Sequence, residues 1–83
     1  MFGRAYKIER GFFYDYPEDE YICLDRDLAI RFAKCLVPLW KAEEYVPDEC
    51  IAGWHWEEVR RTGDLEWTRK WYCYVEPVKL VIV

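Results

Sequence analysis

The chain of 83 residues contains no serine, no asparagine and no glutamine. Asparagine and glutamine are thermolabile amides, and hyperthermophile proteins deplete them while they enrich charged residues. These absences also exclude chemistry: there is no serine nucleophile, no P-loop serine, and no side-chain amide that could read an adenine edge. We therefore expect a heat-adapted protein of a hyperthermophilic archaeon or of an archaeal virus.

Long apolar runs and an excess of basic residues are missing as well. Arg4, Lys7, Glu9 and Arg10 interrupt the N-terminal region, so nothing there resembles a signal peptide or a membrane span. We expect no membrane partner, and a location in the cytoplasm of the host cell or in a virion. The formal net charge of −4 argues against a protein that coats duplex DNA, which needs clustered lysine and arginine.

Aromatic residues, in contrast, are abundant, with five tryptophans, seven tyrosines and four phenylalanines. A chain of this length is expected to form one domain, residues 1–83, and to bury only about 60–65% of its unfolded surface. Large rings compensate for a small core because each can bury roughly 150–250 Å².

The four cysteines show no Cys-x-x-Cys spacing, which gives no sign of a zinc ribbon or of a thioredoxin-like redox site. Intracellular proteins of hyperthermophiles can be rich in disulfides, so structural disulfides and buried free thiols both stay open. The helix and strand patterns described below favour Cys35 with Cys73, and Cys23 with Cys50 as a weaker pair.

The first quarter of the chain alternates as strands do. Tyr6 and Ile8 fall on one face and Lys7 and Glu9 on the other, in a strand region at residues 3–16. Residues 17–20 are predicted to form a turn, and residues 21–24 a second short strand that leads into a helix.

That helix begins at the N-cap Asp25. An apolar stripe at helical spacing is predicted to be buried against a tryptophan-bearing face of the sheet: Leu28, Phe32, Cys35, Leu36 and Leu39. Pro38 removes a backbone donor, so the helix must kink or stop near Val37, and a second short helix is expected at residues 38–45.

A hairpin is predicted next, with residues 51–61 and 65–76 flanking the turn Thr62-Gly63-Asp64. A short turn would set Trp54 across from Trp71, with Trp56 near Arg69. Pro77 should end this strand, and residues 78–83 should form a last strand that is buried on both faces.

The fold class is therefore α+β: one antiparallel sheet of four or five strands, with a kinked or two-part helix on one face. An edge position of the last strand would invite the same strand of a second copy, and we favour a homodimer.

Binding of a protein partner is the function that the charge pattern favours. Six acids stand against one base between Asp15 and Asp27, and such a stretch is either a solvated loop or a docking surface for a basic partner. The residues expected to make this surface are Asp15, Glu18, Asp19 and Glu20.

The alternative is a protein that binds single-stranded nucleic acid through the hairpin, where cations alternate with aromatic rings. Its candidate residues are Arg60, Arg61, Arg69, Lys70, Tyr72 and Tyr74. The competing structural interpretation is that the tryptophan face is simply the core beneath the helix.

Catalysis is the third and weakest interpretation. His55 and Glu57 supply the His-x-Glu half of a zinc-deaminase motif, whose Pro-Cys-x-x-Cys half is missing. Glu57 and Glu58 should point to opposite faces of a strand, so they cannot act as a glycosidase pair. We expect a non-enzymatic protein with no metal and no cofactor.

Overall fold

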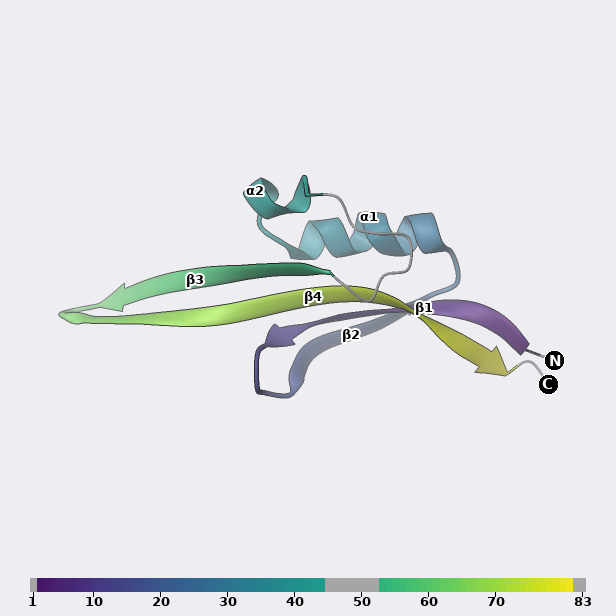
Figure 1. Cartoon of the computed structure of the whole chain (residues 1–83), viewed down its shortest axis with the longest axis horizontal. Helices are drawn as coiled ribbons and strands as arrows, with labels where there is room; N and C mark the ends of the chain where they lie inside the picture. Colours follow the sequence, from purple (N-terminus) through teal and green to yellow (C-terminus); the bar gives the residue numbers. More distant parts are fainter. Residues whose placement is uncertain (1, 45–52, 82–83) are drawn as a thin grey trace.

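The computed structural model describes residues 2–44 and 53–81. It contains one antiparallel sheet with both helices on one side (Figure 1). The elements follow one another as β1 (Phe2–Phe12), β2 (Pro17–Cys23), α1 (Arg26–Leu36), α2 (Leu39–Ala42), β3 (Trp54–Thr62) and β4 (Leu65–Val81). The strand order is β2-β1-β4-β3, so β2 and β3 form the two edges of the sheet. The predicted α+β class, with its strands-helix-strands order, is confirmed.

The sheet is long and staggered, and the molecule has principal extents of 57 × 25 × 17 Å. The pairing of β1 with β4 ends at Phe12, opposite Trp71, while β3 and β4 stay paired as far as Thr62 and Leu65. Residues 59–68 therefore project beyond the other strands as a two-stranded hairpin arm (Figure 1).

The first strand has the predicted alternation, but the turn after it lies earlier than predicted. The chain turns after Phe12, where Tyr14 has a φ of 64°, and Pro17 is already the first residue of β2. A bulge, where the register shifts between Arg10 and Gly11, absorbs the difference in length. The turn predicted at residues 17–20 is wrong because proline is well tolerated as the first residue of an edge strand.

The two-part helix is confirmed. The Oδ1 of Asp25 accepts a hydrogen bond from the backbone N–H of Leu28 at 2.8 Å and caps α1. α1 ends at Leu36 and α2 starts directly after Pro38, whose missing N–H prevents one continuous helix.

The predicted buried stripe of α1 is wrong except at Leu36, which is partly buried and packs against the core. Leu28 and Phe32 keep 49% and 38% of their surface exposed, and Cys35 and Leu39 are exposed too. The residues that face the sheet are Ala29 and Ala33, which are fully buried in the core together with Ile8, Val37, Trp54, Cys73 and Val75. α1 lies against β1 and β4, and small side chains at this contact allow the helix to approach the sheet closely.

The hairpin turn is present, with a register two residues from the predicted one. Gly63 and Asp64 alone form the loop, and the φ of 61° at Gly63 suits glycine. Trp56 lies opposite Trp71, and Trp54 lies opposite Cys73. A shift of two residues keeps every side chain on its predicted face, so the predicted composition of the tryptophan face is still correct.

Pro77 does not end β4, which continues to Val81. The backbone N–H of Phe13 donates to Lys70 O at 2.9 Å, and since hydrogen-bonded pairs alternate along an antiparallel ladder, Tyr6 and Pro77 form a pair that needs no hydrogen bond. The missing N–H of Pro77 therefore costs the sheet nothing, and both the break and the separate last strand were wrong predictions. Val81 keeps 64% of its surface exposed, which also contradicts burial on both faces. The homodimer stays a prediction.

Cys23, Cys35 and Cys73 are free thiols. Cys35 is exposed on α1 whereas Cys73 is buried in the sheet, so the predicted Cys35–Cys73 pairing is wrong. The other predicted pair includes Cys50, which lies outside the described residues.

Candidate functional site

The edge strand β2 offers free backbone groups in a direction that follows from the ladder. The Phe13–Lys70 hydrogen bond shows that odd-numbered residues of β1 turn their N–H and C=O toward β4, so even-numbered ones turn theirs toward β2. Ile8 pairs with Tyr21, and Tyr21 therefore bonds inward. The N–H and C=O groups of Glu20 and Ile22 point outward, where no further strand lies in the part of the chain that the structure describes.

An apolar groove lies beside this edge, on the helix side of the sheet. It has a volume of about 300 Å³. We call it the β2 groove, and it is lined by Ile8, Tyr21, Ile22, Cys23, Leu28 and Phe32. The rings of Tyr21 and Phe32 meet edge to face with centroids 4.8 Å apart. The exposed side of α1 thus forms one wall of the groove and β2 forms the other.

On the face of the sheet away from the helices, three neighbouring strands each carry a carboxylate, from the edge strand β2 through β1 to β4. Glu9 and Glu20 lie directly opposite each other on β1 and β2, and Glu76 lies opposite Lys7 on β4. The Nζ of Lys7 is 2.9 Å from Glu76 and 3.4 Å from Glu9, and the hydrogen bond to Glu76 is the main cause that raises the pKa of Lys7. We call Glu9, Glu20 and Glu76 the acidic strip. One lysine leaves it with a net charge of −2 (three carboxylates less one ammonium).

The predicted acidic segment is only partly brought together. Asp19 forms an ion pair with Arg10 on the helix side, and Asp15 lies in the β1–β2 turn, where its Oδ1 accepts from the N–H of Tyr16 at 2.8 Å. Glu18 is exposed at the start of β2, and Glu20 belongs to the acidic strip.

Sequence reasoning missed Glu9 and the groove residues. The spacing of Leu28 and Phe32 marked an apolar helix side, but which side faces the sheet depended on tertiary packing.

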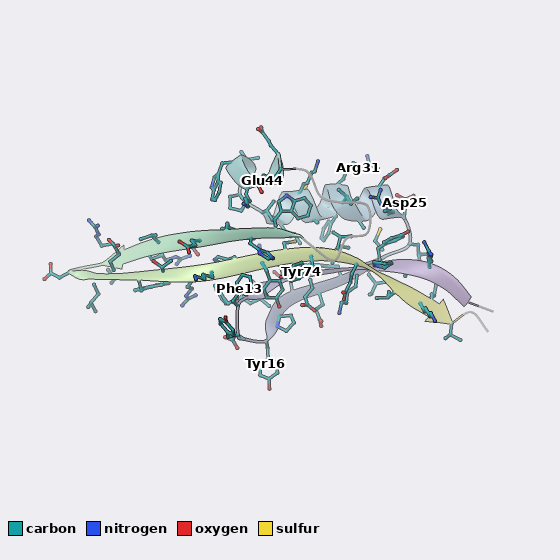
Figure 2. The ribbon with its side chains drawn as sticks, viewed as in Figure 1. Phe13, Tyr16, Asp25, Arg31, Glu44 and Tyr74 are labelled. Atoms are coloured by element: carbon teal, nitrogen blue, oxygen red, sulfur yellow. The ribbon has the colours of Figure 1, made fainter. Side chains whose placement is uncertain are left out.

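The six candidate nucleic-acid residues separate onto two faces. Arg60 and Arg69 lie on the helix side, because they are an even number of residues from Trp56 and Trp71 along their strands. The others lie on the opposite side: Arg61, Lys70, Tyr72 and Tyr74. Figure 2 shows Phe13 and Tyr74 beneath the sheet, opposite the helices.

Tyr72 is not available as a stacking platform because it is buried. Burial, and then its hydrogen bond to Glu9, raise the pKa of Tyr72 to about 12. Its ring stacks on that of Tyr74 with centroids 5.0 Å apart, and the Tyr74 hydroxyl is 2.8 Å from His55 Nε2. His55 points away from the tryptophan face, as predicted.

On the helix side of the hairpin arm, guanidinium groups and rings form a stack that the helices do not cover. The Arg69 guanidinium carbon lies 4.4 Å from the ring centroid of Trp67 and 4.7 Å from that of Phe12, and Arg60 lies 5.8 Å from Trp67. Arg60 is also 2.9 Å from the Glu58 carboxylate. On the opposite face, Arg61 is 2.6 Å from Glu66.

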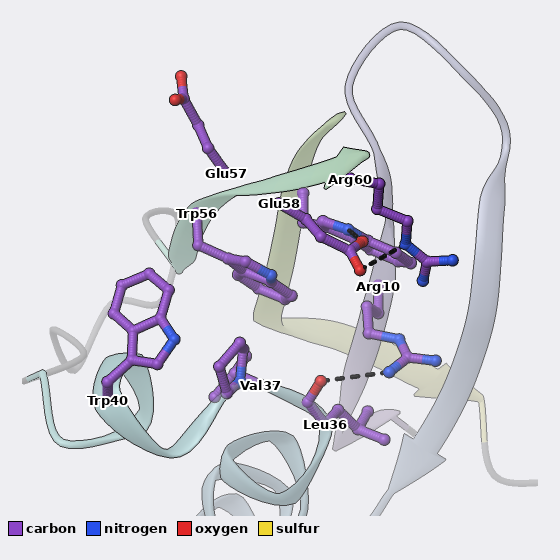
Figure 3. Close-up of a pocket in the computed structure, with 10 residues that line it drawn as sticks. Arg10, Leu36, Val37, Trp40, Trp56, Glu57, Glu58 and Arg60 are labelled. Atoms are coloured by element: carbon purple, nitrogen blue, oxygen red, sulfur yellow. Dashed lines mark hydrogen bonds and ion pairs between the residues drawn. The ribbon is translucent and has the colours of Figure 1, made fainter. Parts of the chain in front are cut away.

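A second cavity, of about 400 Å³, lies between α2 and the hairpin (Figure 3). Trp56 and Trp71 stack there with an angle of 4° between their planes, and Trp40 stands across from them. Glu58 accepts hydrogen bonds from Trp71 Nε1 and Arg60 Nε, each at 2.9 Å, and these bonds, that of Trp71 first, lower the pKa of Glu58. Glu57 points away from the cavity, as predicted for its face.

The charged groups of this cavity are already engaged within the chain. Arg10 donates from Nη1 to the carbonyl oxygen of Leu36 at 3.2 Å and pairs with Asp19 through Nη2. Glu58 and Arg60 neutralise each other. The β2 edge differs, because its outward backbone groups and the charge of the acidic strip are not matched within the described residues.

Metal ligands do not cluster in the described residues: no three His, Cys, Asp or Glu side chains among them come together as a cation would require. Neither α1 nor α2 combines the length and apolar character needed to cross a bilayer, and no other helix is described. Comparison of the chain with protein-family models, curated proteins and solved structures found no match.

Proposed function

We propose that this chain is a heat-adapted, non-enzymatic interaction protein of a hyperthermophilic archaeon or one of its viruses, which binds an extended segment of a protein partner along β2. In this mode the partner adds a strand to the sheet, so that main-chain hydrogen bonds supply affinity and side-chain pockets supply selectivity. The observation that carries the proposal is the coincidence of outward backbone groups at Glu20 and Ile22 with the β2 groove beside them.

Charge complementarity supports a partner rather than a second copy of this chain as the occupant. Two β2 strands paired with each other would bring two acidic strips, and the two exposed Glu18 side chains, to one seam. Like charges in neighbouring strands destabilise pairing. Acidic side chains on an edge strand protect it from self-association and favour a basic segment of another protein.

A selection from random peptides tests the proposal. We expect enriched peptides to protect the amides of Glu20 and Ile22 from hydrogen exchange, and to lose binding to the Ile22→Pro variant. Proline there removes only an outward N–H, so the fold should persist. Ile22→Ala is the matched control, because it removes the side chain but keeps the N–H. Failure to enrich any peptide, or equal affinity for Ile22→Pro and Ile22→Ala, would contradict the proposal.

Binding of single-stranded nucleic acid is the second candidate, and the uncovered stack of Arg60, Trp67 and Arg69 supports it. Bases stack on indole rings while arginines contact phosphates. Arg69→Ala should then weaken oligonucleotide binding and flatten its salt dependence, whereas Arg61→Ala, on the other face and paired with Glu66, should change it less. An absence of tryptophan quenching by oligonucleotides at low salt would eliminate this candidate.

A further inference from the structure

We infer that the segment bound by β2 alternates strictly, with apolar side chains directed into the β2 groove and basic side chains directed over the acidic strip. This inference rests on the proposed strand addition and specifies the chemistry of the partner. The free edge, the groove and the carboxylates each restrict a different property of the bound segment.

The first restriction comes from the faces of the sheet. Tyr21 points to the helix side, where its ring meets Phe32, and Glu20 and Ile22 point to the opposite side. A strand added at the edge continues the pleat, so a residue opposite Tyr21 lies on the groove side and a residue opposite Glu20 lies on the side of the acidic strip.

The second restriction comes from the groove. Leu28 and Phe32 of α1 line the groove and keep part of their surface exposed, so β2 leaves apolar helix surface uncovered beside Tyr21. An added strand would fill this position with every second side chain. Because the groove contains no charged side chain among its lining residues, those side chains must be apolar.

The third restriction comes from charge. Glu9 and Glu20 are directly opposite, and Lys7 is shared between Glu9 and Glu76. A basic side chain opposite Glu20 would give this carboxylate a partner and would reduce the repulsion between Glu20 and Glu9. Exposed Glu18 adds further negative charge at the start of the same strand.

The direction of the backbone hydrogen bonds of β2 determines which residues of the bound segment form them. Since Glu20 and Ile22 turn their N–H and C=O outward, the residues of a segment bound antiparallel to β2 that bond to them are the ones directly opposite, on the acidic-strip side. In the bound segment, basic residues should therefore carry the essential N–H groups, and the apolar residues should not.

Fluorescence anisotropy with two labelled peptides of equal composition tests the pattern. The alternating peptide is Lys-Val-Lys-Leu-Lys-Val-Lys, and the block peptide is Lys-Lys-Val-Leu-Val-Lys-Lys; both read the same in either direction, so the order of side chains along β2 is the same for either strand orientation. The effects expected of N-methylation are those of antiparallel pairing. We expect the alternating peptide to bind about tenfold more tightly, the equivalent of one or two strand hydrogen bonds with their side-chain contacts. N-methylation of its third and fifth residues, both lysine, should abolish binding, whereas N-methylation of its second and fourth residues should be tolerated.

Two matched variants of the protein test whether the basic side chains of the peptide interact with Glu20. Glu20→Lys should weaken the alternating peptide by about tenfold, and Glu57→Lys, the same change on the exposed face of the other edge strand, should leave its affinity unchanged. Equal binding of the two peptides, or equal sensitivity to both sets of N-methyl groups, would overturn the alternating pattern. Neither result tests strand addition itself, which the comparison of Ile22→Pro with Ile22→Ala tests. Failure of the alternating pattern and failure of the proposed function can therefore be told apart.

Discussion

Glu9 of β1 and Glu20 of β2 lie directly opposite each other on the face of the sheet away from the helices, and the lysine beside them is shared by Glu9 and Glu76. Such a pair destabilises the isolated sheet. Its place at an open edge links folding to binding, because the same repulsion is relieved by a basic strand that pairs with β2.

The first prediction concerns this pair. Glu20→Lys should raise the free energy of unfolding by about 0.2–1 kcal/mol, because it replaces a repulsive cross-strand pair by an attractive one. Thermal unfolding at low salt measures the gain, which should shrink in about 1 M NaCl. Glu57→Lys is the control with the opposite sign, since Glu57 faces Lys70 and the change creates repulsion there. A lower melting temperature for Glu20→Lys would refute the interpretation.

The second prediction concerns the contact between α1 and the sheet. Ala33→Leu should destabilise the protein by about 1–3 kcal/mol or more, because Ala33 is fully buried and the added atoms have no space. Phe32→Ala should cost less than the roughly 3–5 kcal/mol typical of a buried phenylalanine, since Phe32 is partly exposed. Urea unfolding of both variants checks the order. A larger loss for Phe32→Ala would mean that the large residues face the sheet.

The third prediction concerns Gly53, at the entry to β3. A Cβ atom there would lie 1.9 Å from the backbone oxygen of Cys73, which cannot move without disturbing β4. Gly53→Ala should therefore destabilise the protein more than Gly63→Ala, where no atom lies within 4 Å of the added group and only the φ of +61° is unfavourable. The cost at Gly63 should be about 1–2 kcal/mol. Circular dichroism melts of the two variants give the comparison, and equal losses would contradict it.

The fourth prediction concerns thiol reactivity. Cys73 is buried, and burial raises the pKa of its thiol to about 12, so the reactive thiolate is scarce at neutral pH. Alkylation of the native protein followed by mass spectrometry of its peptides should label exposed Cys35 and leave Cys73 unmodified until the protein unfolds. Labelling of Cys73 at the rate of Cys35 under native conditions would show that the sheet does not protect it.

The fifth prediction concerns alkaline pH. The folded-state pKa values of Cys73 and Tyr72 are raised to about 12 from 9.0 and 10.0, so the folded state holds these protons more tightly than the unfolded state. Stability from this source is complete below about pH 9 and is lost as pH rises toward about 12. Between about pH 8 and about pH 10.5, urea unfolding should show a larger loss for the wild type than for Cys73→Ala. Parallel losses would exclude a contribution from the thiol.

Local chemistry was readable from the sequence where one residue decides the outcome. Asp25 caps a helix because its side chain reaches the N–H of Leu28, Pro38 divides the helix because it lacks a donor, and Gly63 closes the hairpin because it tolerates a positive φ. Alternation also assigned the faces of β1, β3 and β4 correctly, since the period of two residues is a property of the strand itself.

Only the tertiary structure decided which surfaces meet. Leu28 and Phe32 have the spacing of a buried stripe, yet Ala29 and Ala33 face the sheet, and α1 lies against β1 and β4 through these small side chains. Pro77 stays within β4 because its pairing with Tyr6 requires no donor, a fact of register and not of composition. Glu9 and Glu20 are opposite each other for the same reason. The candidate site was therefore not visible as a motif: it arises where an edge strand, one side of a helix and carboxylates from three strands come together through the register of the sheet.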